Sequence, residues 1–442
     1  MNCVIVGMAR SGIAAARLLK SRGHSVFVTD SSQATAAAEL DGLGVEYELG
    51  RHSVDRFLSA DQIVVSPGVP LDIAPLEAAR RKGVPILGEL ELASRYLLGD
   101  IVAITGSNGK TTTTTLVGEL LKPSGRPVQV GGNIGAALAG LVDGSTPLTI
   151  NVVEVSSFQL DAIDTFHPRV AVLLNITPDH MDRYADFGAY RASKFRIFEN
   201  QEPKDLAVLN RDDPQVWPPP VTIGARIHPF SQKMRVTEGA FRADEQLYLH
   251  GEPVLAVSEV PLRGAHNVEN VLAGMTVAGS YGIAADAIAQ VIRNFRGVEH
   301  RIEPVETIDG IEFFNDSKAT NVDSSVKAVE SFSGNLIVIL GGKDKGASYQ
   351  PLVEAMRGRV KHVLLIGAAS DKISDAIGNE FPTTRVSSMN DAVEKGLALG
   401  KPGDVVLLSP ACASFDMYDN YEHRGRDFKA AVRRKKAMRE NG

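Results

Sequence analysis

Residues 105–112 read Thr105-Gly106-Ser107-Asn108-Gly109-Lys110-Thr111-Thr112, and this stretch is the most informative part of the sequence. It follows the apolar run 101–104 and precedes a segment with a helical pattern. Glycines let several backbone N–H groups converge on phosphate oxygens at a helix N-terminus, while a lysine adds positive charge and a threonine hydroxyl can bind magnesium. The stretch therefore predicts a phosphate-binding loop with ATP as its ligand.

The loop departs from the usual G-x-x-x-x-G-K-[ST] pattern. That pattern would place its first glycine at position 104, where this chain has Ile104. A glycine-containing turn between a strand and a helix is the alternative interpretation. The apolar run before the loop favours phosphate binding, because such loops follow a strand.

Composition sets the outer limits. With 442 residues, 44% hydrophobic and 23% charged, the chain is too long for one core, and we expect two or three globular domains. A net charge of -6 argues against nucleic-acid binding, which relies on clustered Lys and Arg. The two distant cysteines, Cys3 and Cys412, indicate a reducing compartment. With no signal peptide and no membrane-spanning stretch, we expect a cytoplasmic monomer.

Short Val/Ile/Leu runs alternate with helical patterns through three blocks, which is typical of parallel α/β sheets. We expect a Rossmann-like N-terminal domain over residues 1–98. A central, P-loop ATPase-like domain over 99–297 and a Rossmann-like C-terminal domain over 298–442 would follow. The stretch 203–261 is rich in turn residues, and we expect an irregular part of the central domain there.

The first block contains part of a dinucleotide-binding pattern. Gly7 and Gly12 hold the outer positions of G-x-G-x-x-G, but Ala9 replaces the glycine that lets the backbone approach a pyrophosphate. Asp30 ends the next expected strand, about 20 residues after the loop, where an acidic side chain can bind a ribose hydroxyl. The pattern favours a nucleotide other than NAD. A strand-end aspartate that caps a helix is the alternative for Asp30.

A second loop, Ser66-Pro67-Gly68-Val69-Pro70, follows the expected strand 62–65. Loops at the carboxyl edge of an open α/β sheet are where ligands bind. This loop can complete the nucleotide pocket, although by itself it is also an ordinary Pro-Gly turn.

Polar clusters follow two expected strands of the central block. Glu154 follows the run 149–153, and His180 lies beyond the run 171–174. Because the ends of parallel strands meet at one edge, we expect Thr111, Glu154 and His180 to converge beside the phosphates, with oxygen ligands that suit magnesium. An unpaired buried carboxylate is costly, which favours a role for Glu154. A helix-capping or core histidine is the alternative for His180.

The stretch 190–198 reads Tyr-Arg-Ala-Ser-Lys-Phe-Arg-Ile-Phe. Helical spacing places Arg191, Lys194 and Phe198 near one face. Nothing in the local sequence distinguishes Lys194 from an exposed lysine, so spacing alone indicates a solvated basic helix.

The order of the motifs resembles the Mur ligases. The segments are, in chain order, TGSNGKTT, GGNIG, EVSSFQL, NITPDHMDRY, KFRIF, HNVEN, HRIE, NDSKATN, LGGKDKG and LSPACASFD. They span the whole chain. The SSFQL and SPACASFD versions and the Rossmann-like first block are most similar to the family members that add D-glutamate.

This resemblance implies an ATP-dependent amide ligase. In such a reaction ATP phosphorylates a carboxylate of UDP-N-acetylmuramoyl-L-alanine to an acyl phosphate, and the amino group of D-glutamate attacks it. Another Mur-type or folylpolyglutamate-type ligase with a different amino acid is the nearest alternative. A nucleotide-sensing or NAD-binding regulatory module without ligase chemistry is the alternative from another class.

The resemblance also assigns residues of the first two blocks. Lys194 matches the family lysine that is carbamylated and that places a second magnesium ion together with His180. Lys110, Glu154, His180, Lys194 and Lys318 are the expected catalytic set. The ATP-binding loop residues would be Gly106, Asn108, Gly109, Lys110, Thr111 and Thr112, with Thr111 and Glu154 on the first magnesium ion. The expected contacts to the nucleotide-sugar substrate are Arg10, Ser11, Asp30, Ser31, Gly68, Asn133, Ser156 and Gln159.

In the last part of the chain the resemblance implies further contacts. Asn270 would lie against adenine, Arg301 would reach phosphate and Asp316 the ribose, whereas a helix N-cap is the alternative for Asn270. The residues assigned to glutamate are Lys318, Thr320, Lys345, Ser414 and Tyr421. Two positions depart from the family pattern: Arg10 replaces a frequent apolar residue, and Tyr421 stands where the D-glutamate-adding members often have phenylalanine. At these two positions the resemblance does not imply how uracil or the amino acid is bound.

Overall fold

The computed structural model describes residues 1–32, 37–179, 181 and 183–440, and the chain divides into two compact units. Unit 1 comprises Met1–Glu259 and Glu269–Arg293, and unit 2 comprises Val260–Val268 and Asn294–Gly442. The predicted domain limits at residues 98 and 297 stay predictions.

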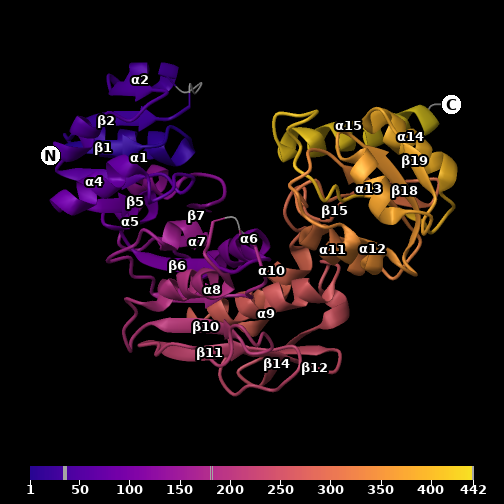
Figure 1. Ribbon diagram of the computed structural model, residues 1–442. Helices are drawn as coiled ribbons and strands as arrows, with labels where there is room; N and C mark the ends of the chain where they lie inside the picture. Colours follow the sequence, from indigo (N-terminus) through magenta and orange to yellow (C-terminus); the bar gives the residue numbers. More distant parts are fainter. Residues whose placement is uncertain (33–36, 180, 182, 441–442) are drawn as a thin grey trace. The chain divides into compact units, whose positions relative to one another are not determined.

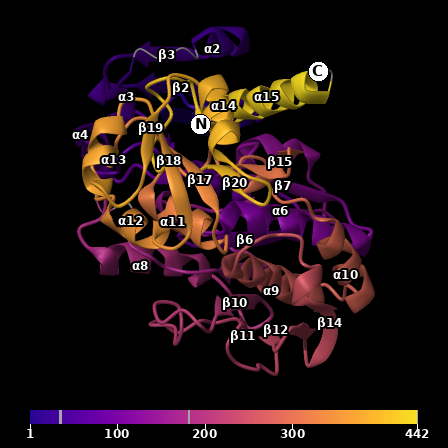
Figure 2. The ribbon, with the colours of Figure 1, turned by 90° about the vertical axis from the view of Figure 1, so that its right-hand side faces the viewer.

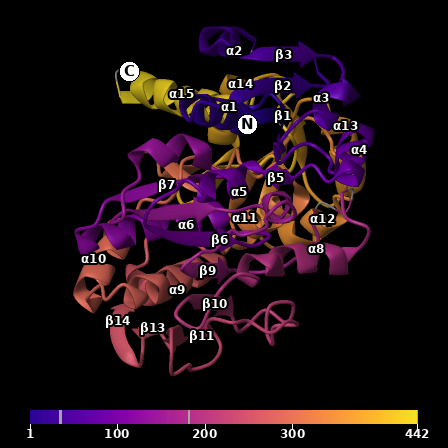
Figure 3. The same cartoon turned by 90° about the vertical axis from the view of Figure 1, so that its left-hand side faces the viewer.

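Unit 1 begins with a five-stranded parallel sheet in the order β3-β2-β1-β4-β5. Successive residues of β1 point to opposite faces: Val4 packs toward α3 and α4, whereas Ile5 packs toward α1 and α5 (Figure 3). The elements are β1 (Asn2–Val6), α1 (Arg10–Ser21), β2 (Ser25–Asp30), α2 (Ala37–Leu43), β3 (Glu46–Leu49), α3 (Val54–Leu58), β4 (Gln62–Val65), α4 (Ala74–Lys82), β5 (Ile86–Gly88) and α5 (Glu89–Ser94).

A second, six-stranded parallel sheet follows in the order β11-β10-β9-β6-β8-β7 (Figure 1). Its strands β8, β9 and β10 are buried along their whole length, as expected for a parallel sheet covered on both faces. The elements are β6 (Asp100–Thr105), α6 (Lys110–Leu121), η1 (Lys122–Ser124), β7 (Val128–Gly132), η2 (Leu138–Gly144), β8 (Ile150–Glu154), α7 (Ser157–Leu160), β9 (Val170–Leu173), α8 (Phe187–Phe195), η3 (Arg196–Phe198), β10 (Leu206–Asn210) and β11 (Arg226–Phe230).

The expectation of an irregular stretch over residues 203–261 is wrong. This stretch supplies β10 and β11 and a three-stranded antiparallel sheet, in which Leu247 and Leu249 are buried. The strands are short and lie between turn residues, which made the composition resemble a loop. The elements are β12 (Ala240–Ala243), β13 (Gln246–Leu249), β14 (Glu252–Ala256) and η4 (Val257–Glu259), followed by α9 (Ala265–Ser280) and α10 (Ala285–Asn294).

Unit 2 is built on a six-stranded sheet in the order β15-β16-β20-β17-β18-β19. All neighbouring strands are parallel except β15 and β16, whose antiparallel pairing the alternating pattern did not predict. Helices α11 to α13 cover one face, and α14 and α15 cover the other (Figure 2). The elements are β15 (Glu303–Ile308), β16 (Ile311–Asn315), α11 (Val322–Glu330), β17 (Leu336–Gly341), α12 (Gln350–Met356), β18 (Val360–Ile366), α13 (Ser370–Ile377), β19 (Thr383–Arg385), α14 (Met389–Leu399), β20 (Val405–Leu408) and α15 (Tyr421–Glu440).

The predicted α/β class with parallel sheets is confirmed. Within the described part of the chain, none of the helices combines the length and the apolar composition that crossing a bilayer requires.

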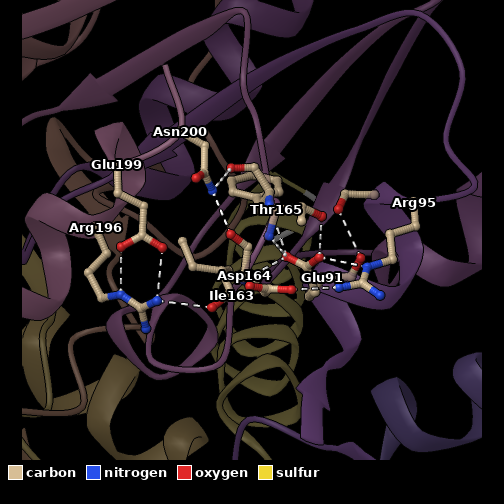
Figure 4. Close-up of polar contacts among 10 residues, drawn as sticks. Glu91, Arg95, Ile163, Asp164, Thr165, Arg196, Glu199 and Asn200 are labelled. Carbon is tan, nitrogen blue, oxygen red and sulfur yellow. Dashed lines mark hydrogen bonds and ion pairs between the residues drawn. The ribbon is translucent and has the colours of Figure 1, made fainter. Parts of the chain in front are cut away.

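Glu91 lies in α5, which follows the last strand of the first sheet, and it binds the loop before β9 through hydrogen bonds. Its side chain is fully buried, and its Oε2 accepts hydrogen bonds from the backbone N–H groups of Asp164, Thr165 and Phe166 at 2.9, 3.1 and 2.9 Å. Its Oε1 accepts from Thr165 Oγ1 at 2.6 Å and from Arg95 Nε at 2.7 Å (Figure 4). Five donors thus converge on one carboxylate, which favours its charged form in spite of burial.

Arg196 holds the same loop from the other side. Its guanidinium donates to the backbone carbonyls of Leu160 and Ile163 at 2.7 and 2.9 Å and pairs with Glu199 (Figure 4). The loop between α7 and β9 is therefore held by polar contacts on two sides.

Glu89, two residues before Glu91, has the opposite environment. It is 1% exposed, its Oε1 accepts one hydrogen bond from Ala139 N at 2.7 Å, and its Oε2 has no hydrogen-bond partner among the described residues. Burial raises the pKa of Glu89 to about 7, and the Ala139 N–H offsets only part of this effect. The folded protein therefore holds a proton at Glu89 over a pH range in which the unfolded chain has lost it.

We expect this proton to make stability depend on pH. Between about pH 4.5 and 7 the folded state binds more protons at Glu89 than the unfolded state, so raising the pH favours unfolding by up to about 3 kcal/mol. Glu89→Gln lacks this dependence. We therefore expect the free energy of unfolding of the variant, measured in urea, to rise by about 1–3 kcal/mol relative to that of the wild type when the pH is raised from about 5 to about 8. A difference in stability between the two proteins that is the same at about pH 5 and at about pH 8 would contradict the assignment.

Candidate active site

The phosphate-binding loop connects β6 to α6, as the sequence predicts. Gly109 has a φ of +82°, in the left-handed region that favours glycine. A Cβ atom at Gly109 would lie 2.3 Å from Asn270 Oδ1, so the close approach of α9 also requires a glycine here. The loop ends at Lys110, the first residue of α6. A glycine-containing loop at a helix N-terminus is a typical place for a bound phosphate.

Asn175 and Thr177 follow β9 and hold this loop in shape, although the sequence assigned them no role. Asn175 Oδ1 accepts from Asn108 N at 2.8 Å, and Asn175 Nδ2 donates to Asn108 O at 3.1 Å. Ser107 Oγ donates to Thr177 O at 2.9 Å. β6 and β9 are neighbours, so the loops that follow them are brought together. The polar run after an expected strand was the available signal for Asn175 and Thr177.

Two lysines converge on the same loop carbonyl. Lys110 Nζ lies 2.8 Å from Gly106 O and 3.0 Å from Ser107 O, and Lys194 Nζ lies 2.9 Å from Gly106 O. Lys194 is 1% exposed, so the interpretation of this residue as part of a solvated basic face is wrong. It lies on α8, which places its ammonium 4.7 Å from the centre of the Tyr190 ring.

Burial, and next the positive charge of Lys110, lower the pKa of Lys194 well below its ordinary value, while Asp179 and Asp161 act in the opposite direction. A lowered pKa makes it easier for this lysine to lose its proton, and only the unprotonated amine is a nucleophile. The Lys194 amine lies in contact with the phosphate-binding loop.

Glu154, at the end of β8, is the buried carboxylate of this edge. It is 2% exposed, and its Oε1 accepts from Asn133 Nδ2 at 2.7 Å. Its Oε2 has no hydrogen-bond partner among the described residues. Such an oxygen is costly unless something satisfies it, and a magnesium ion is a suitable partner. β8 neighbours β6 with Glu154 opposite Ile104, so Glu154 and the loop with Thr111 lie at the same sheet edge. His180 lies outside the described residues.

A cavity of about 590 Å³ in unit 1 collects most of the residues predicted for the nucleotide-sugar. We call it the nucleotide cavity. Gly7, His52, Pro70 and Ile73 also line it. Pro70 belongs to the loop 66–70 that the sequence analysis placed at this pocket, whereas His52 and Ile73 were missed because nothing in their local sequence marks them. The predicted residues that line it are Arg10, Ser11, Asp30, Ser31, Gly68, Asn133 and Gln159.

Asp30 shapes this cavity. Its Oδ2 accepts from Met8 N at 2.7 Å, and its Oδ1 accepts from Ser32 N and Oγ at 2.8 and 2.7 Å. Burial by itself raises the pKa of Asp30, but the hydrogen bonds from Ser32 and Met8 outweigh it and leave the pKa below its ordinary value. Asp30 therefore stays charged while it holds the loop after β1.

Ser156 and Gln159 form a reciprocal cap at the start of α7. Ser156 Oγ accepts from Gln159 N at 3.3 Å, and Gln159 Oε1 accepts from Ser156 N at 2.9 Å. Gln159 lines the nucleotide cavity, whereas Ser156 is absent from its described lining. The structure thus gives Ser156 a local role in holding Gln159.

In unit 2 the predicted residues lie on loops that start at one sheet edge. β20 lies between β16 and β17, so the loops after these three strands begin side by side. They carry Asp316, Lys318 and Thr320 after β16, Lys345 after β17 and Ser414 after β20.

Asp316 and Ser414 are buried and Lys345 is exposed. Asp316 accepts from Ser409 Oγ at 2.8 Å and from Ile302 N at 3.3 Å, and burial raises its pKa to about 7. Lys318 Nζ lies 5.1 Å from the centre of the Tyr421 ring, close enough for a cation–π contact.

Asn270 and Arg301 have environments that the sequence did not reveal. Asn270 lies inside α9, so the helix N-cap alternative is wrong, and its Oδ1 accepts from Thr113 Oγ1 at 3.1 Å. Arg301 is half-buried between His300 and Ile302, whose φ angles of +66° and +43° are rare for residues with side chains. Backbone strain of this kind is often found at functional sites.

Three family models match the chain in order. They are described as the Mur ligase MurD-like N-terminal domain, over residues 1–88, the Mur ligase middle domain, over 104–278, and the Mur ligase glutamate ligase domain, over 300–412.

Curated relatives are similar over nearly the full length. The UDP-N-acetylmuramoylalanine-D-glutamate ligase of Acidobacterium capsulatum is 46% identical over 439 residues, which cover 97% of this chain and 95% of the relative. The ligase of the same name from Citrifermentans bemidjiense is 46% identical over 437 residues, which cover 97% of each.

Solved structures share the fold at low identity. The UDP-N-acetylmuramate-alanine ligase MurC of Thermotoga maritima matches with a TM-score of 0.63 at 21% identity, covering 99% of this chain and 100% of that one. The MurF ligase of Thermotoga maritima in complex with ADP matches with a TM-score of 0.60 at 17% identity, covering 87% and 92%.

Proposed function

This chain belongs to the Mur ligase family, and we propose that it is an ATP-dependent ligase that joins D-glutamate to UDP-N-acetylmuramoyl-L-alanine in peptidoglycan precursor synthesis. The main support for the proposal is the 46% identity, over 97% of the chain, to ligases named for this reaction. The phosphate-binding loop and the nucleotide cavity would supply two of the three binding functions that such an enzyme needs, those for ATP and for the nucleotide-sugar.

The chemistry explains why ATP is required. A carboxylate is a poor electrophile, so phosphate is first transferred from ATP to the L-alanyl carboxylate, which gives ADP and an acyl phosphate. The amino group of D-glutamate then forms the amide bond, the bond to phosphate breaks, and the amine loses a proton. Positioning and charge neutralisation are the main tasks of the protein in phosphoryl transfer.

The phosphate-binding loop would perform the first of these tasks. The backbone of Gly106, Asn108 and Gly109 and the side chains of Thr111 and Thr112 would surround the ATP phosphates. Lys110 contacts loop carbonyls in this structure and would turn to the phosphates when ATP binds. Asn270, Arg301 and Asp316 are proposed further contacts to the nucleotide.

The donor set at the sheet edge fits magnesium. Thr111 and Glu154 would hold one ion, and Glu154 Oε2, which has no hydrogen-bond partner within the described part of the chain, supports this assignment. Lys194 and His180 would hold a second. Magnesium, when bound, neutralises phosphate charge.

Lys194 would act as a carbamate. The ammonium would first lose a proton; the neutral amine would then add to carbon dioxide with formation of an N–C bond and loss of a second proton. A carbamate, with one negative charge shared by two oxygens, would replace the ammonium. Burial and the lowered pKa support this reaction, because only the unprotonated amine adds to carbon dioxide.

The nucleotide cavity would bind the UDP-sugar, and the loops of unit 2 would bind glutamate through Lys318, Thr320, Lys345, Ser414 and Tyr421. We further propose three domains with limits near residues 98 and 297, a monomer, a cytoplasmic location and, through peptidoglycan, a role in cell shape and division.

The test supplies UDP-N-acetylmuramoyl-L-alanine, ATP and either enantiomer of glutamate and identifies the product by mass. We expect a product heavier by one glutamyl residue with D-glutamate only, and phosphate release that requires both substrates. Product formation with a different amino acid would instead support another Mur-type or folylpolyglutamate-type ligase. ATP binding without phosphate release, whatever amino acid is supplied, would indicate a nucleotide-sensing module.

A further inference from the structure

Arg424 is a buried arginine that sequence analysis did not select. It lies in the first turn of α15 and is 2% exposed. Its Nε donates to Ser317 Oγ at 3.0 Å and its Nη2 to Ser317 O at 2.8 Å. Its Nη1 donates to Cys412 O at 3.1 Å and, more weakly, to Ala413 O at 3.4 Å. All of these acceptors are carbonyls or a hydroxyl, and none is a carboxylate.

These contacts join the loops that carry the proposed glutamate site. Ser317 stands between Asp316 and Lys318, and Ala413 immediately precedes Ser414. Ser317 Oγ also donates to Tyr421 O at 2.8 Å, which adds the start of α15 to the same network. One guanidinium therefore connects the loop after β16 with the loop after β20.

The loop after β17 joins this network through the backbone. Lys343 N donates to Ala413 O at 2.8 Å, and Ala413 N donates to Lys343 O at 3.1 Å. Gly342 packs so closely here that a Cβ atom would lie 2.3 Å from Ala413 O and 3.1 Å from Arg424 Nη1. All three loops therefore meet around Arg424, with no space for a side chain at Gly342.

The chemistry of this position requires arginine. Burial lowers the pKa of Arg424 to about 10, so the guanidinium stays protonated at neutral pH. Among the described residues no carboxylate accepts a hydrogen bond from Arg424, although the charges of Asp416 and Asp316 partly offset the effect of burial. A buried charge of this kind is costly, and a hydrophobic residue would serve packing alone better. The planar guanidinium presents several donors in fixed directions, whereas a lysine presents a single ammonium that cannot reach acceptors on both loops in the same way.

We propose that Arg424 is a positioning residue whose planar fork holds the loops after β16 and β20 in the geometry that binds glutamate. This inference rests on the proposed function, since it names what fixes the amino-acid site. Arg424 acts through Lys318, Thr320, Ser414 and Tyr421 and does not itself touch the substrate.

The test compares Arg424→Lys, which keeps the charge and loses the fork, with Arg426→Lys, a control at an exposed arginine on the same helix. We expect the KM for D-glutamate to rise about tenfold or more in Arg424→Lys. The KM for UDP-N-acetylmuramoyl-L-alanine, whose proposed contacts lie in unit 1, should stay within about twofold of the wild type. Amide hydrogen exchange should become faster at residues 315–320 and 411–414 in this variant only.

A second variant separates positioning from general destabilisation. Ser317→Ala keeps Arg424 but removes the hydroxyl between Arg424 and Tyr421, and it should raise the KM for D-glutamate in the same way. In the double variant with Arg424→Lys, the fold-increase in the KM for D-glutamate should be smaller than the product of the two separate fold-increases, because both changes break one network.

Three results would overturn the inference. The first is that Arg424→Lys changes neither the KM for D-glutamate nor the amide hydrogen exchange. The second is that the fold-increases in KM of the two variants multiply in the double variant. The third is that the variants lower only kcat, in proportion to a smaller folded fraction. A wild-type enzyme that forms no glutamyl product would instead refute the proposed function, and the exchange measurement would still decide whether Arg424 holds the loops.

Discussion

Lys194→Ala is expected to lower the rate of phosphate release by about 10³-fold or more, the scale on which removal of a fixed charged group from a water-excluded site acts. Lys194 is buried, lies 2.9 Å from Gly106 O of the phosphate-binding loop, and has a pKa lowered by burial and by Lys110. Burial and a lowered pKa both disfavour the ammonium form of Lys194, which supports the proposed carbamate. Steady-state phosphate release with all three substrates measures the effect.

Further variants separate the carbamate from the charge of lysine. Lys194→Arg keeps a cation that does not react with carbon dioxide, and it should be as inactive as the alanine variant. Acetate added to Lys194→Ala should restore part of the activity, because it supplies an anionic oxygen donor to the space left by the side chain. Lys204→Ala, at an exposed lysine, is the control and should keep wild-type activity. Full activity of Lys194→Ala at ordinary bicarbonate would refute the assignment.

Glu91→Ala is expected to lower the free energy of unfolding by about 3–5 kcal/mol. The change removes the acceptor of five hydrogen bonds and leaves the N–H groups of residues 164–166, of which Phe166 is buried, without that partner. Urea unfolding measures the effect. Glu77→Ala, which removes an exposed glutamate 4.0 Å from Arg81, is the matched control and should change stability by no more than about 0.5 kcal/mol.

The pH dependence provides a second check on Glu91. Burial by itself raises the pKa of Glu91, but the hydrogen bonds from Thr165, Asp164 and Arg95 outweigh it, and the pKa is lowered. A carboxylate with a lowered pKa stabilises the fold above its unfolded pKa, and this contribution is lost as the pH falls through the folded pKa. The stability difference between wild type and Glu91→Gln should therefore shrink below about pH 4.5. A difference that stays constant on acidification would show that the charge of Glu91 is not what holds the loop.

Local sequence patterns determined the elements that carry the site. The run 101–112 predicted a strand, a glycine loop and a helix, and the structure has β6, the loop and α6 in these places. Asp30 was selected because it ends a strand about 20 residues after a glycine loop, and Glu154 because the ends of parallel strands meet at one sheet edge. In the structure each is the last residue of its strand. The order of the motifs indicated the family. These features depend on short-range spacing, which is present in the chain before it folds.

Long-range pairing decided the rest. Lys194 has the local sequence of an exposed lysine, and only the packing of α8 against the phosphate-binding loop buries it. Arg424 stands in a charged helix that looks solvated, yet its partners are 107 and 12 residues away. Glu89 and Glu91 are two residues apart in one helix, and their pKa values shift in opposite directions because one carboxylate meets a single described donor and the other meets five. Burial and hydrogen-bond partners depend on which segments the sheet order brings together, and spacing along the chain does not contain that information.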